Sequence, residues 1–171
     1  MKRSLGFIAT VLVMSLGFTA AAQSSVMAAA PTPAQTCRAA EEAKEYDKAF
    51  RSCTQAAEAG DLESQYTLGQ LYEKGNGVPL NLEAAFKWYS RAAEKGHAGA
   101  ARRVAAAYYW GLGGVAKDDA KAFQWFKRAA EGGDRRAQKQ MAEAYRRGLG
   151  GLPKDENLAR EWDERAKRNK N

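Results

Sequence analysis

The chain has 171 residues, of which 45% are hydrophobic and 27% charged, a composition that excludes a disordered, collagen-like or multi-pass membrane chain. Its length suits one domain that can bury a core without metals or many disulfides, and a single histidine excludes a His-rich metal site. The formal charge of +7 points to an anionic partner such as nucleic acid or lipid, if the basic residues are clustered.

The N-terminal residues have the parts of a secretory signal peptide: a positive start, an apolar stretch and small residues before a cleavage site. Cleavage is expected after Ala22, and a second run of alanines ends at Ala30, where the following proline disfavours cleavage. The alternative is an uncleaved membrane anchor, for which the apolar stretch is barely long enough. We therefore expect residues 1–22 to be a signal peptide and residues 23–35, rich in Gln, Ser, Ala, Pro and Thr, to be a flexible leader.

Cys37 and Cys53 are the only cysteines, and in an exported protein an even pair predicts a disulfide. Residues 36–60 are expected to form a capping hairpin, with helices over about 36–44 and 47–58. The two cysteines lie at similar distances on either side of the turn, so antiparallel helices would place them opposite each other. A disulfide there would stabilise the hairpin by restricting the unfolded chain. The alternative is two buried free thiols.

Three further segments, 61–96, 97–133 and 134–168, repeat one pattern. Each contains Tyr-x-x-Gly-x-Gly, and the intervals between these motifs are 36 and then 37 residues. Tryptophans recur 37 residues apart, at Trp88, Trp125 and Trp162. Agreement of many positions at one spacing in this range is typical of a helical solenoid.

Each segment is expected to fold as two helices, A and B. The A helices span about 61–74, 97–110 and 134–147, and the glycine after each suits the left-handed residue that ends a helix. The B helices follow aligned capping residues, which are Asn81, Asp118 and Asp155. Their apolar residues recur at i, i+3, i+4 and i+7, the spacing of one helix face.

The last segment loses apolar residues that the earlier B helices use for stacking. Tyr89 and Phe126 are replaced by Asp163 at the equivalent position. A polar outer face is expected of a repeat that ends a solenoid. The sequence therefore predicts an all-α fold: an α/α superhelix (solenoid) of about four helical hairpins over residues 36–171, with 36–37-residue repeats.

The repeated pattern resembles that of the Sel-one-like repeat (SLR) family, which is related to the tetratricopeptide repeat. In the segment 61–96 the resemblance rests on Ser64, Leu68, Gly69, Tyr72, Gly75, Gly77, Val78, Asn81, Ala84, Ala85, Trp88, Tyr89, Ala92, Ala93, Glu94 and Gly96. It extends from about residue 36 to 168. The resemblance implies a right-handed superhelix that binds other proteins. Exported bacterial members are similar in having a signal peptide and cysteines that bridge helix pairs.

The leading hypothesis is a non-catalytic scaffold or adaptor of the bacterial envelope. Its partner would bind the concave side of the solenoid, where A-helix residues are not needed in the core. Candidate contact residues are the large aromatic and basic side chains on that face, namely Arg102, Arg103, Tyr109, Trp110, Lys139, Arg146 and Arg147. The aromatic pair is the first choice, since such residues dominate binding hot spots. The alternatives are that Trp110 packs against the next hairpin and that the basic residues are a solvated face.

An exported β-lactamase-like or cell-wall-related enzyme is an alternative that the family resemblance leaves open. A serine enzyme of that kind needs Ser-x-x-Lys, which does not occur, and neither His-Glu-x-x-His nor a phosphate-binding loop occurs. His97 stands at a helix start and is expected to be a surface or capping residue rather than a catalytic base. We therefore predict no enzyme activity and no catalytic, metal-binding or cofactor-binding residue.

The basic residues are unevenly distributed along the chain. Residues 23–101 hold 8 Lys and Arg against 10 Asp and Glu, whereas residues 102–171 hold 17 against 10. An acidic protein surface, or else an anionic lipid or glycan, would therefore bind the second and third segments. We expect no nucleic-acid partner and at most peripheral membrane contact, because the mature chain is predicted to be soluble and exported, either periplasmic or secreted.

Overall fold

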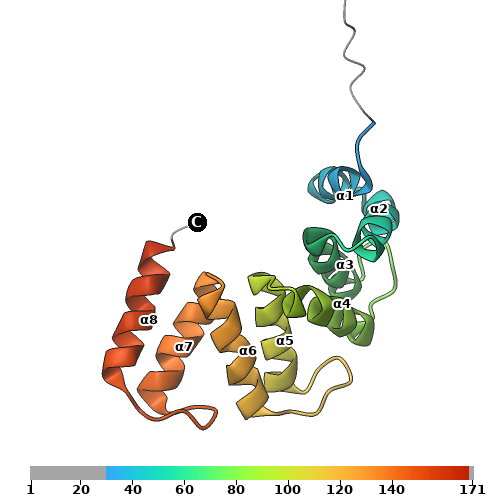
Figure 1. Ribbon diagram of the computed structural model, residues 1–171. Coiled ribbons are helices and arrows are strands. Elements are labelled where there is room, and N and C mark those ends of the chain that lie inside the picture. The colour runs from blue at the N-terminus through green and yellow to red at the C-terminus, as the bar shows by residue number, and fades with distance from the viewer. Residues whose placement is uncertain (1–29, 170–171) are drawn as a thin grey trace, which may run out of the picture. The chain divides into compact units, whose positions relative to one another are not determined.

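A computed structural model describes residues 30–169, so the predicted signal peptide and most of the predicted leader lie outside the described residues. The described part contains eight α-helices and no β-strand (Figure 1). The helices are α1 (Pro33–Glu42), α2 (Tyr46–Glu58), α3 (Leu62–Lys74), α4 (Leu82–Glu94), α5 (Ala98–Trp110), α6 (Asp119–Glu131), α7 (Arg135–Arg147) and α8 (Glu156–Arg168). Among them there is none with the length and apolar composition that a membrane crossing requires.

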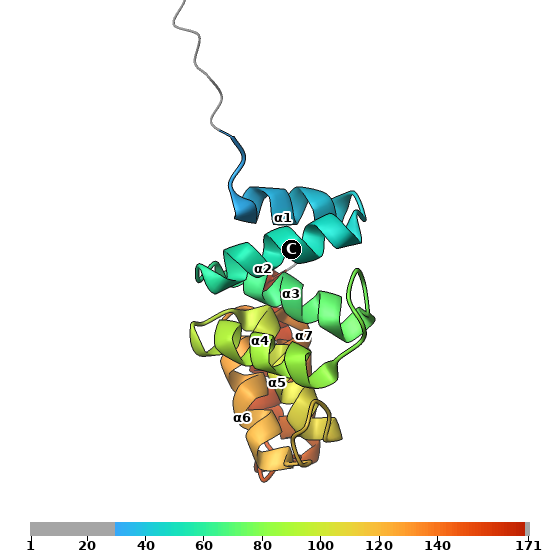
Figure 2. The ribbon, with the colours of Figure 1, turned by 90° about the vertical axis from the view of Figure 1, so that its right-hand side faces the viewer.

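The helices pack in chain order as four hairpins, α1–α2, α3–α4, α5–α6 and α7–α8. The second helix of each hairpin also packs against the first helix of the next one. Figure 2 shows this succession for α1 to α4, which lie one below another in that view. Contacts confined mainly to neighbouring hairpins are those of a solenoid, so the predicted all-α fold is confirmed.

The A helices begin directly after a residue whose side chain caps them. Asp134 Oδ1 accepts a hydrogen bond from Ala137 N at 2.7 Å, just before α7. His97 has the same role before α5, where its Nδ1 accepts a hydrogen bond from Ala100 N at 3.0 Å. The predicted A helices therefore agree with α3, α5 and α7, which start one residue after their caps.

The first helix differs from its prediction, because α1 begins at Pro33 rather than at residue 36. The Thr32 hydroxyl accepts a hydrogen bond from Gln35 N (3.2 Å), and the Gln35 side chain accepts one from Thr32 N (2.8 Å). This reciprocal pair is a capping box, and proline suits the first position of a helix. Residues 33–35, which the prediction assigned to the leader, are therefore helical.

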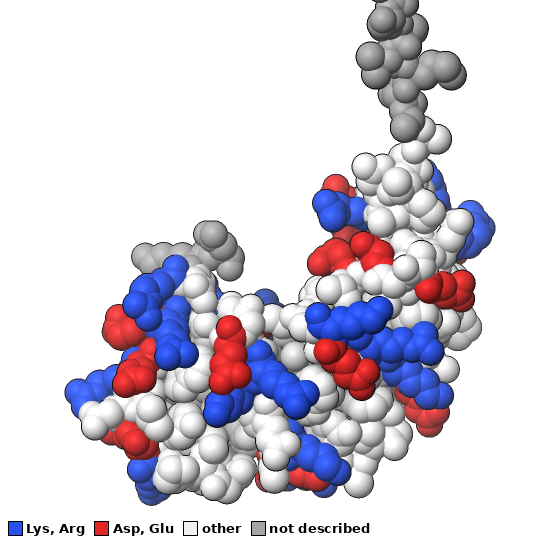
Figure 3. Space-filling model, viewed as in Figure 1, with Lys and Arg blue, Asp and Glu red and all other residues white. Residues whose placement is uncertain are grey.

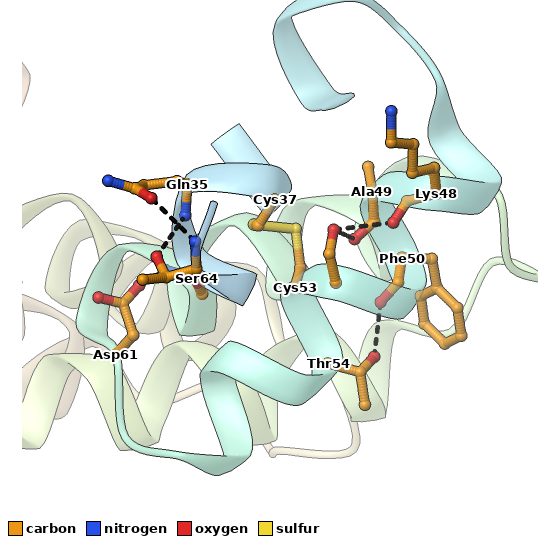
Figure 4. Close-up of a disulfide and its surroundings, with 11 residues drawn as sticks. Gln35, Cys37, Lys48, Ala49, Phe50, Cys53, Thr54, Asp61 and Ser64 are labelled. Atoms are coloured by element: carbon orange, nitrogen blue, oxygen red, sulfur yellow. Dashed lines mark hydrogen bonds between the residues drawn. A yellow bond between two sulfur atoms is a disulfide. The ribbon is translucent and has the colours of Figure 1, made fainter. Parts of the chain in front are cut away.

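Cys37 of α1 and Cys53 of α2 are joined by a disulfide, with their Cα atoms 4.7 Å apart (Figure 4). Both cysteines are buried, with 2% and 0% of their surface exposed. They belong to a small core that also contains Ala49, Leu68 and Leu71. The disulfide therefore links the two helices of the first hairpin inside the core that joins this hairpin to α3.

Small residues let the helices of the repeats approach closely. Ala100, Ala105 and Ala122 are fully buried between helices. Gly69 of α3 faces the buried ring of Tyr89 on α4, and a Cβ at this glycine would lie 2.6 Å from a ring carbon. Interiors packed this tightly tolerate little added volume, which explains why the repeat has glycine or alanine at these positions.

A glycine in each loop between an A helix and its B helix packs against the preceding B helix. Gly77, Gly113 and Gly150 have φ values of 68°, 68° and 63°. A Cβ on Gly113 would lie 2.8 Å from the Leu82 carbonyl oxygen, and one on Gly150 would overlap the Phe123 ring of α6. The second glycine of the repeated Gly-x-Gly motif therefore holds successive hairpins in contact.

Each B-helix tryptophan packs against an arginine one turn later in the same helix. The pairs are Trp88–Arg91, Trp125–Arg128 and Trp162–Arg165, with the guanidinium carbon 4.6, 4.7 and 4.6 Å from the ring centroid. Such cation–π contacts stabilise the folded chain. Part of the basic excess of the second and third repeats therefore has a structural role.

Candidate partner-binding surface

The A helices of the three repeats, α3, α5 and α7, start at equivalent caps, so equivalent residues occupy the same place on successive helices. Near their N-terminal ends, one row of equivalent residues consists of Tyr66, Arg102 and Lys139. Near their C-terminal ends, another row consists of Lys74, Trp110 and Arg147. The predicted contact residues are therefore distributed over both ends of these helices.

The first row borders an open hollow of about 600 Å³, which we call the basic hollow. It is lined by Tyr66, Arg102, Gly133, Asp134, Arg135, Arg136 and Lys139. Of the seven predicted contact residues, Arg102 and Lys139 meet in this hollow. The other five lie elsewhere on α5 and α7.

The cations of the basic hollow fall into two groups. Arg102 Nε donates a hydrogen bond to Asp134 Oδ2 at 3.0 Å, and only 16% of the Arg102 side chain is exposed. Arg135, Arg136 and Lys139 are exposed, and none of the ion pairs formed among residues 30–169 involves them. The hollow therefore combines one fixed arginine with three cations that form no ion pair with a carboxylate of the described chain.

Arg103 lies in a hydrogen-bonded network between α3, α4 and α5. Its Nη1 donates to Glu73 Oε1 at 3.1 Å, and the Tyr89 hydroxyl donates to Glu73 Oε2 at 2.7 Å. Burial, together with the bond to Glu73, raises the pKa of Tyr89 far above its usual value. Burial, the largest single influence, would lower the pKa of Arg103, but Glu73, Tyr89 and Tyr66 together outweigh burial and raise it. Arg103 therefore links neighbouring helices and is only partly available to a partner.

Tyr109 and Trp110 stand at the C-terminal end of α5. Their rings meet edge to face, with centroids 4.8 Å apart, and Tyr109 also lies edge-on to Phe123 of α6 at 6.2 Å. The Trp110 side chain is 69% exposed, and Leu112 just beyond the helix is 46% exposed. Trp110 therefore faces solvent rather than packing into the next hairpin, and Tyr109 contacts both Trp110 and Phe123 of α6.

Arg146 and Arg147, at the C-terminal end of α7, have acidic neighbours. Arg146 Nη1 donates to Glu143 Oε2 at 3.0 Å and its Nη2 to Asp163 Oδ2 at 2.8 Å. These bonds, first that to Glu143, raise the pKa of Arg146. Arg147 Nη1 lies 3.5 Å from Glu143 Oε1. Figure 3 shows basic and acidic side chains lying next to each other in this way over much of one face.

Arg135 and Arg136 are candidate contact residues that the comparison of repeats missed. They occupy the first turn of α7, where α3 has the acidic Glu63. Basic residues there are unfavourable, because the N-terminal end of a helix carries a partial positive charge. Two adjacent arginines directly after the cap Asp134 are the sequence signal that identifies the basic hollow.

Proteins of known structure share this arrangement of helices. A Sel1 repeat protein from Oxalobacter formigenes has a TM-score of 0.77 and 31% identity, over 82% of this chain and 55% of that one. A protective antigen present in uropathogenic Escherichia coli strains, which displays an SLR fold, has a TM-score of 0.68 and 31% identity, over 83% of this chain and 34% of the antigen. Chitin synthase regulator SKT5 of Saccharomyces cerevisiae is 46% identical over 50 residues, which are 29% of this chain and 7% of the yeast protein. This chain therefore spans about half of the Oxalobacter protein, about a third of the antigen and less than a tenth of the yeast regulator.

The three repeats each match one family model. The family model of the Sel1 repeat matches residues 62–97, 98–134 and 135–171. These matches begin at the first residues of α3, α5 and α7, so each one contains one A–B hairpin. Together they cover well over half of the sequence, and the chain belongs to the Sel1 repeat family.

Proposed function

We propose that this protein is a non-catalytic adaptor that binds a partner protein through the exposed faces of α3, α5 and α7. The observation that carries the proposal is the exposure of Trp110, at 69%, beside the exposed Leu112. Tryptophan is among the residues that contribute most to binding hot spots, and grouped apolar side chains at the surface are typical of interaction sites. The family supports the proposal, since Sel1 repeats commonly mediate protein–protein interaction, and the yeast relative is named as a regulator of another protein.

The proposed surface extends along one face of α5. Arg103, Ala106 and Trp110 are spaced i, i+3 and i+7, which places them on the same side of the helix. Trp110 and Leu112 would supply the apolar centre of the contact, and the basic hollow near the other ends of these helices would supply its charged part. A partner lying along the A helices would meet both.

The place of action that we propose is the bacterial envelope. The buried Cys37–Cys53 disulfide supports it, because disulfides persist in oxidising compartments. The predicted signal peptide (1–22) gives the route of export. We therefore propose that the mature chain meets its partner in the periplasm or outside the cell.

The enzyme alternative has weaker support. The pKa of Tyr89 is raised, so its hydroxyl is protonated at neutral pH, and this hydroxyl donates a hydrogen bond to Glu73. Tyr89 is therefore a poor nucleophile or base. In the part of the chain that the structure describes, no group of three His, Cys, Asp or Glu side chains could hold a metal ion. An adaptor role accounts for the exposed aromatic residue, which a hydrolase mechanism would not require.

Crosslinking in the envelope tests the adaptor proposal. A photoreactive benzoylphenylalanine is placed at position 112, which keeps Trp110 intact, and a second chain carries it at position 87 on the B helix α4. We expect a discrete protein adduct from position 112 and none from position 87, with the partner identified by mass spectrometry. Adding Trp110→Ala to the position 112 chain should reduce the adduct about tenfold, as expected when a hot-spot side chain is truncated.

Two results would overturn the proposal. One is an equal yield of the same adduct from positions 112 and 87, which would mean collision rather than docking on the A-helix face. The other is an undiminished adduct after Trp110→Ala, in a chain whose circular dichroism and melting temperature match those of the wild type.

A further inference from the structure

The basic hollow concentrates cations that the fold itself does not use. Arg135, Arg136 and Lys139 project from the first half of α7, and no carboxylate among residues 30–169 forms an ion pair with them. Arg102 of α5, which is paired with Asp134, also lines the hollow. Elsewhere on the A helices, Arg103 and Arg146 are paired with carboxylates.

We propose that the basic hollow binds an acidic peptide segment of the partner protein, with at least two carboxylates close together in its sequence. The inference rests on the proposed function, because it names the chemistry that the A-helix face recognises. Guanidinium groups bind carboxylates through two parallel hydrogen bonds. Neighbouring carboxylates on one segment would satisfy the arginines of α7 together with Lys139.

The placement of Arg135 and Arg136 costs the fold stability. Two adjacent like charges stand in the first turn of α7, where a helix prefers acidic residues. In the equivalent turn of α3, Glu63 has the favourable sign. Positions that break a local rule of this kind are expected at functional sites, and a bound carboxylate would convert this repulsion into attraction.

The walls of the hollow are held in place before a ligand arrives. Arg102 is fixed by its bond to Asp134, whose other carboxylate oxygen accepts from the α7 backbone. Tyr66 is stacked on His97, with ring centroids 4.5 Å apart and planes 24° from parallel. The aromatic wall offers apolar contact to a peptide chain, and preorganised walls lower the entropic cost of binding.

The shape of the hollow favours a peptide over two other anionic partners. The acidic residues Glu41, Glu42, Asp61 and Glu63, which a second copy of this chain could offer, line a hollow of their own together with Arg38. Both surfaces are concave, so neither inserts into the other. A lipid bilayer presents a broad surface rather than a side chain that enters a hollow of about 600 Å³. A projecting acidic segment fits both the charge and the shape.

Fluorescence anisotropy with defined probes tests this inference. The probe is a fluorescein-labelled peptide of alternating Glu and Asp, and its counterpart has Gln and Asn in their place. We expect the acidic probe alone to bind, and binding to weaken steeply as NaCl rises from about 50 to about 500 mM. The variant Arg135→Gln/Arg136→Gln should bind about tenfold more weakly, as expected for two exposed ion pairs, with an unchanged or raised melting temperature.

A matched variant separates the hollow from net charge. Arg160→Gln/Arg168→Gln removes the same charge from two exposed arginines of α8, and it should bind the probe within about twofold of wild type. Equal weakening by both variants would overturn the inference, because net charge would then explain binding. It would also be overturned if phosphatidylglycerol vesicles, but not the peptide, bound in a way that depended on Arg135 and Arg136.

Self-association of the chain that Arg135→Gln/Arg136→Gln abolishes would likewise overturn it in favour of a second copy. The crosslinking from position 112 distinguishes failure of this inference from failure of the adaptor proposal. If the position 112 adduct forms as expected while the acidic probe fails to bind, the choice of an acidic segment is wrong and the adaptor proposal stands. If the acidic probe binds and no adduct forms from position 112, the adaptor proposal is wrong and the affinity of the basic hollow for an acidic peptide stands.

Discussion

Replacing Cys37 and Cys53 together by alanine lowers the free energy of unfolding of the first hairpin by about 3 kcal/mol. The cysteines are 16 residues apart, and closing a loop of that length restricts the unfolded chain by about this amount. The helix α1 has only 10 residues, and its buried residues are Cys37 and Ala40. A helix of that length is marginal by itself, so the disulfide is the main restraint that keeps α1 folded against α2.

The effect should be local, because each hairpin of a solenoid is stabilised by its neighbours alone. Hydrogen exchange monitored by mass spectrometry should show faster exchange in α1 and α2 of the alanine variant, with α5 to α8 unchanged. The wild-type chain, reduced in denaturant and then refolded in the presence of a reductant, is the second arm, and it should show the same loss. Retention of protection in α1 in both arms, or an even loss over all eight helices, would contradict the local role of the disulfide.

Gly150→Ala has the second large expected effect. Gly150 has a φ of 63°, and its Cβ would overlap the ring of Phe123, which is 5% exposed on α6. The left-handed backbone costs alanine about 1–2 kcal/mol, and forcing atoms into a packed contact adds about 1–3 kcal/mol. The variant should therefore lose about 2–5 kcal/mol of stability, seen as a lower urea midpoint by circular dichroism.

Gly151→Ala is the matched control for this substitution. Gly151 has a φ of 80°, and nothing lies within 4 Å of the Cβ that alanine would add. It carries the backbone cost of about 1–2 kcal/mol without the packing cost. Equal losses in the two variants would show that contact with Phe123 does not hold the α7–α8 hairpin to the α5–α6 hairpin.

The helices could be predicted from the sequence because their signals are local and repeated. Caps such as Asp134 and the glycines that end the A helices recur at one spacing, so each repeat supports the assignment in the others. The start of α1 was predicted too late because it has no equivalent among the repeats. Its capping box between Thr32 and Gln35 is a local signal that repeat alignment does not use.

The candidate surface could be predicted only in part, because alignment shows which residues share a face but not which of them are already paired. Arg102 meets Asp134 and Arg103 meets Glu73, each across nearly one repeat in sequence. Such partners belong to neighbouring helices, so their pairing depends on how the helices pack. The exposure of Trp110 likewise depends on packing, because an aromatic residue at the end of a helix is as suited to a core as to a surface.

Hydroxyl-radical footprinting of the chain, alone and with the partner identified by crosslinking, tests the binding face most directly. Trp110 is exposed at the end of the A helix α5, whereas Trp88 and Trp125 are half-buried on the B helices α4 and α6. The account predicts that the partner lowers the oxidation rate of Trp110 and leaves those of Trp88 and Trp125 unchanged. Protection of Trp88 or Trp125, with Trp110 oxidised as fast as in the free chain, would contradict it.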